Sequence, residues 1–320
     1  MMKYKILLIG FGSIGKRHYS LLKKRNDVEC IDIVSAHSKI KTTRVFNFLE
    51  QIPYSDLSSY HIFIICTETY KHEENLKYIN SLIENKIILV EKPLSKSSIA
   101  LNYINNNIFV SYNIRFHPIV NKIKEITNNE EILICNAIVG QYLPTWRENT
   151  NYLESYSASL ERGGGVLRDL SHEIDLVKYI CGNIKLVSAL SSSHSNLNLK
   201  SDDICTILAS NNHSAHIVIQ MDYLALTHKR LMFIQTNNLT IKADLISNIL
   251  EVTDIHKNLK TYNYDWINRN YTYESLHNEL LLDQSIPKNT ITTFEDGNHT
   301  MKIIDIITDQ YMEKNWLKNN

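Results

Sequence analysis

Three glycines between a strand-like run and a helix-like run constrain the fold of this chain most. The apolar run YKILLIG has strand length, and it leads through GFGSIG into a segment whose apolar residues have helical spacing. Gly10, Gly12 and Gly15 thus form GxGxxG, in which the glycines permit a tight turn, an approach to pyrophosphate and close helix–strand packing. With Ser13 and Ile14 opening the helix, this turn predicts dinucleotide binding rather than an ordinary strand–turn–helix.

The end of the second strand-like run bears on which dinucleotide is bound. VECIDIV is followed by SAHSK, where a site that prefers NAD usually places an acidic residue. Asp32 lies inside the run, whereas Ser35, Ser38 and Lys39 follow it and can hydrogen-bond a 2′-phosphate. The sequence therefore predicts a preference for NADP(H), with NAD(H) possible. The alternative is a solvated turn without cofactor selectivity.

Strand-like and helix-like segments go on alternating through the first third of the chain. Residues 61–85 and 86–104 each read as strand, turn and helix, and residues 107–118 supply another strand. This alternation predicts an α/β fold with a doubly wound parallel sheet, on which ligands lie beyond the carboxyl ends of the strands. Residues at such ends are Thr67, Glu68, Glu91, Lys92 and Asn113.

Composition excludes several other classes of protein. The 320 residues suggest about two domains, and the 34 basic residues balance the 34 acidic ones, which gives no electrostatic reason to expect nucleic acid or an anionic membrane as partner. The longest apolar runs are strand-sized, and the N-terminus lacks the features of a secretory signal. Five scattered cysteines without a CxxC pair favour a reducing cytoplasm.

The stretch GGGVLRDLSHEID holds three of the nine glycines beside several titratable groups. We expect the glycines to open a helix from about 166 to 180, on which Asp169, His172 and Asp175 lie roughly on one side. A histidine there can exchange a proton near neutral pH, and a carboxylate can orient it or bind a substrate hydroxyl. A purely structural cluster is the alternative; a metal site has no further ligand pattern to support it, and none is predicted.

Several segments in the same order resemble the Gfo/Idh/MocA family, the glucose–fructose oxidoreductase and inositol dehydrogenase-like proteins. They are GFGSIGKRH, CTETYKH (with Glu68 in place of the usual proline), EKP at Glu91–Pro93, VSYNIRFHP and GGGVLRDLSHEID. The resemblance runs from Lys3 to about Met312. It implies a Rossmann domain at 1–117 and a substrate-binding and oligomerisation α/β domain at 118–320. The second domain has a large open, mostly antiparallel sheet, and its terminal helix, about 293–314, packs near the first domain.

The second half of the chain fits that implied sheet. Six successive strand candidates are separated by turn residues, and few long helices intervene after Cys181.

The resemblance also implies roles for particular residues. Lys92 points at the reacting sugar beside the nicotinamide, and a cis bond before Pro93 is expected. Thr67, His72 and Glu91 belong to the cofactor site by position. His172 is the implied acid/base, with Asp169 binding substrate or orienting the histidine. The family spacing, however, puts the histidine four residues after the aspartate, where this chain has Glu173. Either His172 is catalytic after a shortened turn, which we favour, or Glu173 enters the site.

The loop before the triple glycine supplies further substrate candidates. Trp146 and Tyr156 can stack on a ring, Arg147 can bind a carboxylate or phosphate, and Asn113 and Arg115 follow a strand that leads to the same pocket. A packed surface loop is the alternative.

Together these features predict an NAD(P)-dependent oxidoreductase acting on a sugar, sugar acid, nucleotide sugar or cyclitol, as a homodimer or homotetramer. A redox-neutral NAD-dependent glycosidase and a catalytically silent dinucleotide-binding sensor are the alternatives.

Overall fold

The chain divides into two compact units. The computed structural model describes residues 3–38, 40–147, 151–282 and 288–319, with side chains described as far as Met312. The first unit comprises Met1–Tyr112 and Tyr273–Met301, and the second comprises Asn113–Thr272 and Lys302–Asn320. The division falls slightly earlier than residue 117, and a later segment returns to the first unit.

The first unit contains a seven-stranded sheet in the order β15-β6-β5-β4-β1-β2-β3. All neighbouring pairs are parallel except β15 with β6. Its strands are β1 (Tyr4–Ile9), β2 (Val28–Val34), β3 (Val45–Phe46), β4 (Ile62–Ile65), β5 (Ile87–Val90), β6 (Asn107–Val110) and β15 (Thr292–Thr293). β4 and β5 are buried along their whole length, as expected for parallel strands covered on both faces.

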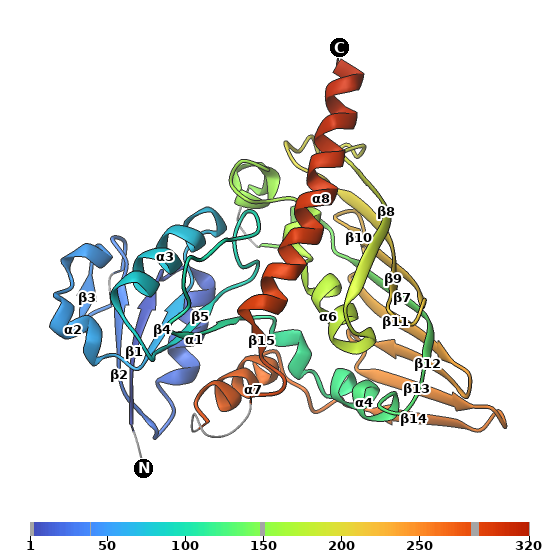
Figure 1. Ribbon diagram of the computed structural model, residues 1–320, viewed down its shortest axis with the longest axis horizontal. Helices are drawn as coiled ribbons and strands as arrows, with labels where there is room; N and C mark the ends of the chain where they lie inside the picture. The colour runs from blue at the N-terminus through green and yellow to red at the C-terminus, as the bar shows by residue number, and fades with distance from the viewer. Residues whose placement is uncertain (1–2, 39, 148–150, 283–287, 320) are drawn as a thin grey trace. The chain divides into compact units, whose positions relative to one another are not determined.

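The helices of the first unit are α1 (Ser13–Leu22), α2 (Tyr54–Ser59), α3 (His72–Leu82) and most of α7 (Tyr271–Leu280). The terminal helix α8 (Phe294–Asn319) begins in the first unit and continues in the second. Figure 1 traces these elements along the chain.

The helix expected between β5 and β6 does not form. Residues 91–106 contain no helix, and Ile99 instead exchanges two backbone hydrogen bonds with the side chain of Asn298. Pairing with this distant side-chain amide satisfies the N–H and C=O groups of Ile99, which a helix would otherwise have paired.

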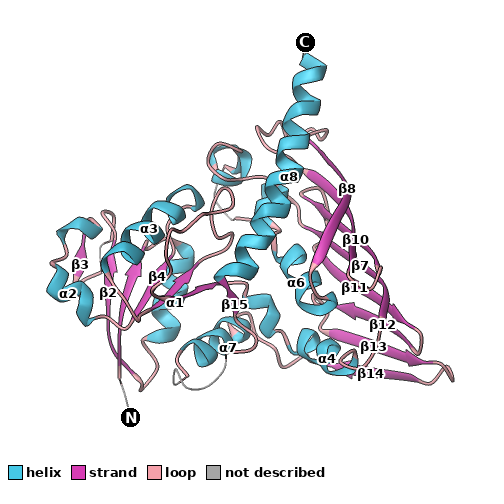
Figure 2. Ribbon diagram, viewed as in Figure 1, coloured by secondary structure: helices cyan, strands magenta, loops and turns pink. Residues whose placement is uncertain are grey.

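The second unit contains an eight-stranded sheet in the order β14-β13-β12-β11-β7-β10-β9-β8. Every neighbouring pair is antiparallel except β7 with β10. Its strands are β7 (Ile132–Gly140), β8 (Ile184–Ser192), β9 (Ile204–Asn211), β10 (His216–Asp222), β11 (Lys229–Thr236), β12 (Leu239–Asp244), β13 (Ile249–Asp254) and β14 (Leu259–Asn263). Figure 2 shows both sheets in magenta. The expected fold class is confirmed: a Rossmann-type parallel sheet and a large, mostly antiparallel one.

Helices cover one face of the second sheet. They are α4 (Pro118–Ile126), α5 (Val166–Asp169) and α6 (His172–Cys181), and α6 packs against β7 and β8 (Figure 1). The single helix expected from 166 to 180 is in fact two, because the chain leaves helical geometry at Leu170, where φ is −101° and ψ is 19°. Asp169 and His172 therefore lie on different helices.

Candidate functional site

In the glycine turn after β1, two of the three glycines have no room for a Cβ atom, and the third has room for one. Gly10 has φ +95°, and a Cβ there would lie 2.6 Å from the Cys66 carbonyl oxygen. A Cβ on Gly15 would strike the Gly10 carbonyl, whereas no described atom lies within 4 Å of a Cβ placed on Gly12. Gly12 is the exposed N-cap of α1, and Ser13 and Ile14 follow it as the first helical residues. The backbone amides at this helix N-terminus are thus accessible to an anion.

The carboxylate of Asp32 is engaged within the first unit. Its Oδ2 accepts a hydrogen bond of 2.6 Å from the Tyr60 hydroxyl. Burial, followed by this bond, raises the pKa of Tyr60 above its usual range. Ser35 and Ser38 are half-buried beyond the end of β2, and Lys39 lies outside the described residues. The residues from 35 to 44 include no carboxylate.

The buried side chain of Glu91 holds the turn after β5 through hydrogen bonds. The Lys92–Pro93 bond is cis, as the resemblance implied. Glu91 is 5% exposed; its Oε1 lies 2.8 Å from His18 Nε2, and its Oε2 accepts a 3.2 Å hydrogen bond from the Lys92 amide. Burial raises the pKa of Glu91, but the hydrogen bond and charge of His18, the Ser111 hydroxyl and the charge of Lys92 together outweigh burial. The pKa of Glu91 therefore lies below its usual value, and Glu91 is ionised.

His18 continues into a second buried histidine. His18 Nδ1 lies 2.7 Å from Nε2 of His277 on α7, and both imidazoles are almost completely buried. Burial, and then the neighbouring His18, holds the pKa of His277 well below its usual value. His277 is therefore neutral at physiological pH.

His72, expected in the cofactor site, lies between two backbone carbonyl oxygens. Its Nδ1 lies 2.9 Å from the Pro93 carbonyl oxygen, and its Nε2 lies 2.9 Å from the Thr67 carbonyl oxygen. His72 is 1% exposed. It therefore ties the loop after β4 to the turn after β5, while Thr67 is half-buried and lies at the expected strand end.

In the second unit, the triple glycine allows close packing at the start of α5. A Cβ on Gly164 would lie 2.8 Å from the Ser157 backbone. Gly165 has φ +104°, and a Cβ there would strike the Asp202 carboxylate. That carboxylate accepts a 2.9 Å hydrogen bond from the Leu167 amide, and burial raises the pKa of Asp202 to about 6. The glycines thus bring a buried acid to the helix that carries Asp169.

Asp169 lies within a group of aromatic residues. Its Oδ2 accepts a 2.7 Å hydrogen bond from the buried Tyr223 hydroxyl. Tyr156 also bonds Asp169, and burial followed by that charge raises the pKa of Tyr156 above its usual range. The Tyr223 ring meets the Trp146 ring edge-on, with centroids 5.8 Å apart. Tyr156, predicted as a stacking residue, therefore also contacts Asp169 through its hydroxyl group.

At the start of α6, His172 is half-buried, whereas Glu173 and Asp175 each form a buried ion pair. His172 is half-buried at the first position of the helix. Glu173 is 2% exposed and forms a 2.8 Å salt bridge with Arg230 of β11. Asp175 accepts two hydrogen bonds from Arg115, of 2.8 and 2.7 Å. These pairs occupy Glu173 and Arg115.

Two more buried polar side chains lie near the start of the second unit. Asn113 is buried and donates a 2.7 Å hydrogen bond to Thr272. His117 caps α4: its Nδ1 accepts from the Ile119 amide at 3.2 Å, and burial lowers the pKa of His117 to about 4.

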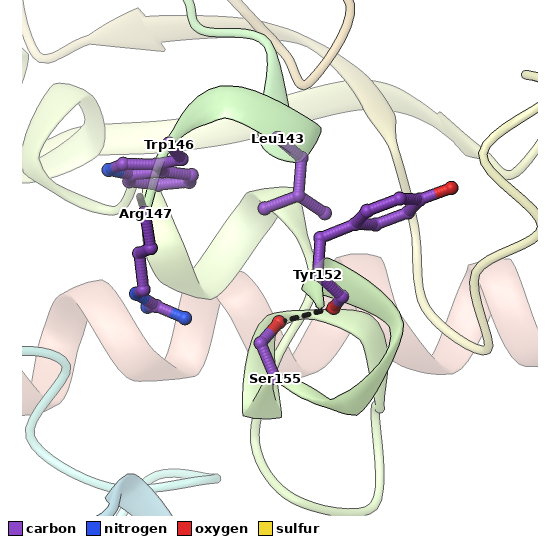
Figure 3. A pocket seen from close by; sticks show the side chains of 5 residues that line it. All are labelled: Leu143, Trp146, Arg147, Tyr152 and Ser155. Carbon is purple, nitrogen blue, oxygen red and sulfur yellow. Dashed lines mark hydrogen bonds between the residues drawn. The ribbon is translucent and has the colours of Figure 1, made fainter. Parts of the chain in front are cut away.

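The loop after β7 borders a small pocket that is open to solvent. Figure 3 shows Trp146 and Arg147 at one side and Leu143, Tyr152 and Ser155 at the other. The Arg147 guanidinium carbon lies 4.8 Å from the Tyr156 ring centroid and 5.9 Å from that of Trp146. Trp146, Arg147 and Tyr156, all predicted from the sequence, therefore lie together.

Sequence reasoning missed the residues that support these groups. His18, His277, Tyr223, Arg230 and Asp202 were not assigned roles, although His18 lies within the GFGSIGKRH segment. Only that proximity offered a signal. Within the described ranges, no group of three or more potential metal ligands occurs. None of the described helices combines the length and apolar composition needed to cross a bilayer.

Comparison with known proteins addresses the fold. No protein-family model matches the chain. A curated relative, the uncharacterized oxidoreductase YrbE of Bacillus subtilis (strain 168), is 28% identical over 191 residues, which are 55% of this chain and 53% of the relative. The matched part thus spans about half the length of that relative.

Solved structures match nearly the whole chain. Levoglucosan dehydrogenase in complex with NADH has a TM-score of 0.82 at 18% identity, and 98% of each chain is covered. An NAD binding oxidoreductase from Klebsiella pneumoniae has a TM-score of 0.82 at 15% identity, also with 98% of each chain covered. The chain has the Gfo/Idh/MocA fold.

The WlbA dehydrogenase from Bordetella pertussis, in complex with NADH and UDP-GlcNAcA, shares this fold. Its TM-score is 0.77 at 16% identity, with 98% of this chain and 96% of WlbA covered. The Gfo/Idh/MocA fold comprises both sheets of this chain: the parallel sheet that carries the glycine turn, and the mostly antiparallel sheet against which α6 packs.

Proposed function

We propose that this chain is an NAD(P)-dependent oxidoreductase that transfers hydride between nicotinamide and a hydroxyl-bearing carbon of a sugar, sugar acid, nucleotide sugar or cyclitol. One observation carries the proposal: the open Gly12 turn and the anchored Glu91–Lys92 turn follow β1 and β5, which flank β4 in one parallel sheet. Ligands bind beyond this edge of such sheets. The dinucleotide is assigned to the first unit and the substrate to the second.

The predicted cofactor residues of the first unit have distinct proposed roles. Gly10, Gly12, Ser13, Ile14 and Gly15 hold pyrophosphate through backbone amides and close packing. Thr67 and Glu91 shape the remaining cofactor site, and His72 supports it from behind. When bound, the cofactor supplies the hydride donor or acceptor.

The protein's own groups handle the proton of the substrate hydroxyl. Lys92 and His172 are the proposed proton-exchanging residues. Asp169, fixed by Tyr223, binds a substrate hydroxyl or orients His172. Asn113 and Arg115 support the substrate side through Thr272 and Asp175.

The test is turnover followed by the absorbance of reduced nicotinamide, with NADP and NAD supplied separately against free sugars, sugar acids, nucleotide sugars and cyclitols. Net reduction by one substrate, lost in Lys92→Ala and His172→Ala, is the expected result. Release of sugar from a glycoside without net cofactor change would instead identify the glycosidase. Cofactor binding without turnover of any compound would favour the sensor.

We also propose that NADP(H) is preferred. The support is local: Asp32 is bonded to Tyr60, and Ser35 and Ser38 follow β2 without a carboxylate nearby in sequence. NADPH is expected to bind more tightly than NADH in a fluorescence titration. Ser35→Asp should reverse that order, because a carboxylate repels a 2′-phosphate and accepts from a 2′-hydroxyl. Equal or tighter NADH binding by the native protein would contradict this preference.

Within the proposed substrates, an anionic sugar is favoured by Arg147. Its guanidinium lies over Tyr156 beside the pocket of Figure 3, and Trp146 provides a ring face there. Arg147→Met should raise KM for a sugar acid or nucleotide sugar at least tenfold and leave KM for a neutral sugar unchanged. Equal effects on charged and neutral sugars would contradict the assignment.

The remaining proposals concern assembly and location. A homodimer or homotetramer formed through the uncovered face of the second sheet is supported by Leu190, Leu208, Leu231 and Ile249, which are exposed and share that face by register. A reducing, cytoplasmic location is supported by the five free cysteines, all of which lie in the described ranges.

A further inference from the structure

The turn that presents Lys92 rests on a buried chain of three ionisable side chains, Glu91, His18 and His277. The contacts are 2.8 Å from Glu91 Oε1 to His18 Nε2 and 2.7 Å from His18 Nδ1 to His277 Nε2. The exposed fractions are 5%, 0% and 1%, respectively. These three side chains come from the turn after β5, from α1 and from α7; they are far apart in sequence, and all three residues belong to the first unit. No role proposed above uses either histidine.

Glu91 links this chain to the backbone of Lys92. One carboxylate oxygen is bonded to His18 and the other accepts from the Lys92 amide at 3.2 Å. Because the two oxygens belong to one planar carboxylate group, the hydrogen bond to His18 restricts the orientation of that plane. The same restriction fixes where the second oxygen lies relative to the Lys92 amide. A charged group bonded on both oxygens in a buried site has little freedom to reorient.

His277 fixes the ring of His18 in turn. The ring of Tyr273 meets His18 edge-on with centroids 5.4 Å apart, and His277 occupies the remaining ring nitrogen. Removing His277 would leave a buried imidazole nitrogen without this partner, which favours rotation of the ring or entry of water. Either change would be passed to Glu91 through a single hydrogen bond.

We propose that His18 and His277 are positioning residues that hold Glu91, and through it the backbone at Lys92, in one orientation. The inference rests on the proposed proton-exchanging role of Lys92. It adds α7, an element more than 250 positions after α1 in the chain, to the machinery of the site.

Three variants separate positioning from general destabilisation. His277→Leu removes the hydrogen bond to His18 and fills the position with an apolar side chain. His277→Gln can present an amide group near the position of Nε2. Leu276→Ala, at a neighbouring and fully buried position of α7, destabilises the same helix without touching the chain of hydrogen bonds.

The first measurement is steady-state kinetics at a temperature where all variants are folded. His277→Leu is expected to lower kcat on the order of tenfold with KM values for cofactor and substrate nearly unchanged. His277→Gln should retain at least about a third of kcat, and Leu276→Ala should lower Tm but keep kcat. Equal loss of kcat in Leu276→Ala, or no loss in His277→Leu, would overturn the proposal.

The second measurement does not depend on activity. Exchange of the Lys92 amide is followed by NMR in protein with ¹⁵N-labelled lysine. Faster exchange by about tenfold in His277→Leu, but not in His277→Gln or Leu276→Ala, is expected. Unchanged exchange in His277→Leu would overturn the proposal even if native turnover is found. If the native protein turns over no compound, the proposed function fails, and exchange alone decides whether the histidines hold this backbone.

Discussion

At the scale of single residues, Gly10 and Gly12 have different requirements within one turn. Gly10 has a positive φ and is closed by the Cys66 carbonyl, whereas Gly12 faces open space. Gly10→Ala should therefore lower the free energy of unfolding by about 2 kcal/mol, while Gly12→Ala should leave it nearly unchanged and weaken dinucleotide binding. Chemical denaturation and NADPH titration of the two variants check this. Loss of stability in both variants would contradict an open Gly12.

The buried Asp202 predicts a pH-dependent cost. Its pKa in the folded protein is about 6, against an ordinary value of 3.8, because burial penalises the carboxylate. A raised acid pKa means that the folded state holds the proton more tightly, so stability from this group is present below pH 3.8 and is lost as pH rises through 6. The rise in the pKa of Asp202 from 3.8 to about 6 corresponds to a cost of about 3 kcal/mol above that window.

Asp202→Asn keeps an oxygen for the Leu167 amide and removes the charge. The variant should gain stability relative to the native protein at about pH 7 and gain little or nothing at about pH 4. Denaturant titrations at the two pH values measure this difference. A gain of the same size at both pH values would show that ionisation is not its cause.

The residue types in the sequence predicted some members of the site but not the ion pairs that they form. The composition of GGGVLRDLSHEID identified every titratable group near the start of α6. It could not show that Glu173 pairs with Arg230, 57 positions later, or that Asp175 pairs with Arg115, 60 positions earlier. Such pairings depend on how strands and helices pack, and that information is not contained in local spacing.

At the scale of elements, local patterns identified strands more reliably than helix ends. The six strand candidates of the second half correspond to β7–β12, whereas β13 and β14 were not anticipated. β14 is LKTYN, a mostly exposed edge strand with little apolar alternation, so the usual signal is absent. The break between α5 and α6 was also missed, because LRDLSHEID contains neither glycine nor proline to mark it.

The cap of α4 predicts a second pH effect of opposite sign. His117 accepts a hydrogen bond from the Ile119 amide, and burial lowers its pKa from 6.5 to about 4. Stability from this group is therefore present above pH 6.5 and is lost as pH falls through 4, by up to about 3 kcal/mol. His117→Asn keeps an N-cap acceptor that does not titrate.

His117→Asn should accordingly lose less stability than the native protein between about pH 7 and about pH 4. Thermal unfolding across that range is the measurement. Parallel curves for the variant and the native protein would mean that His117 does not titrate in this window.

At the scale of the whole molecule, the order of elements predicted the fold because strand–helix alternation and a run of strands each admit few architectures. The composition of the units was harder to predict. Tyr273–Met301 joins the first unit after an intervening unit of some 160 residues, and it carries His277 and Asn298 to their partners. Contacts over such separations leave no periodic trace in the sequence.

The uncovered face of the second sheet leads to the last prediction. Leu208 and Leu231 lie on this face and are 47% and 40% exposed, while α6 packs on the other face. If a second copy covers them, Leu208→Lys together with Leu231→Lys should convert the oligomer to a monomer, because burying two lysines without partners is strongly unfavourable. Light scattering coupled to size exclusion measures the mass. Tyr54→Lys, which adds one lysine at an exposed position of α2, should leave the mass unchanged. A native protein that is already monomeric, or a double variant that keeps its oligomeric mass, would show that this face does not form the interface.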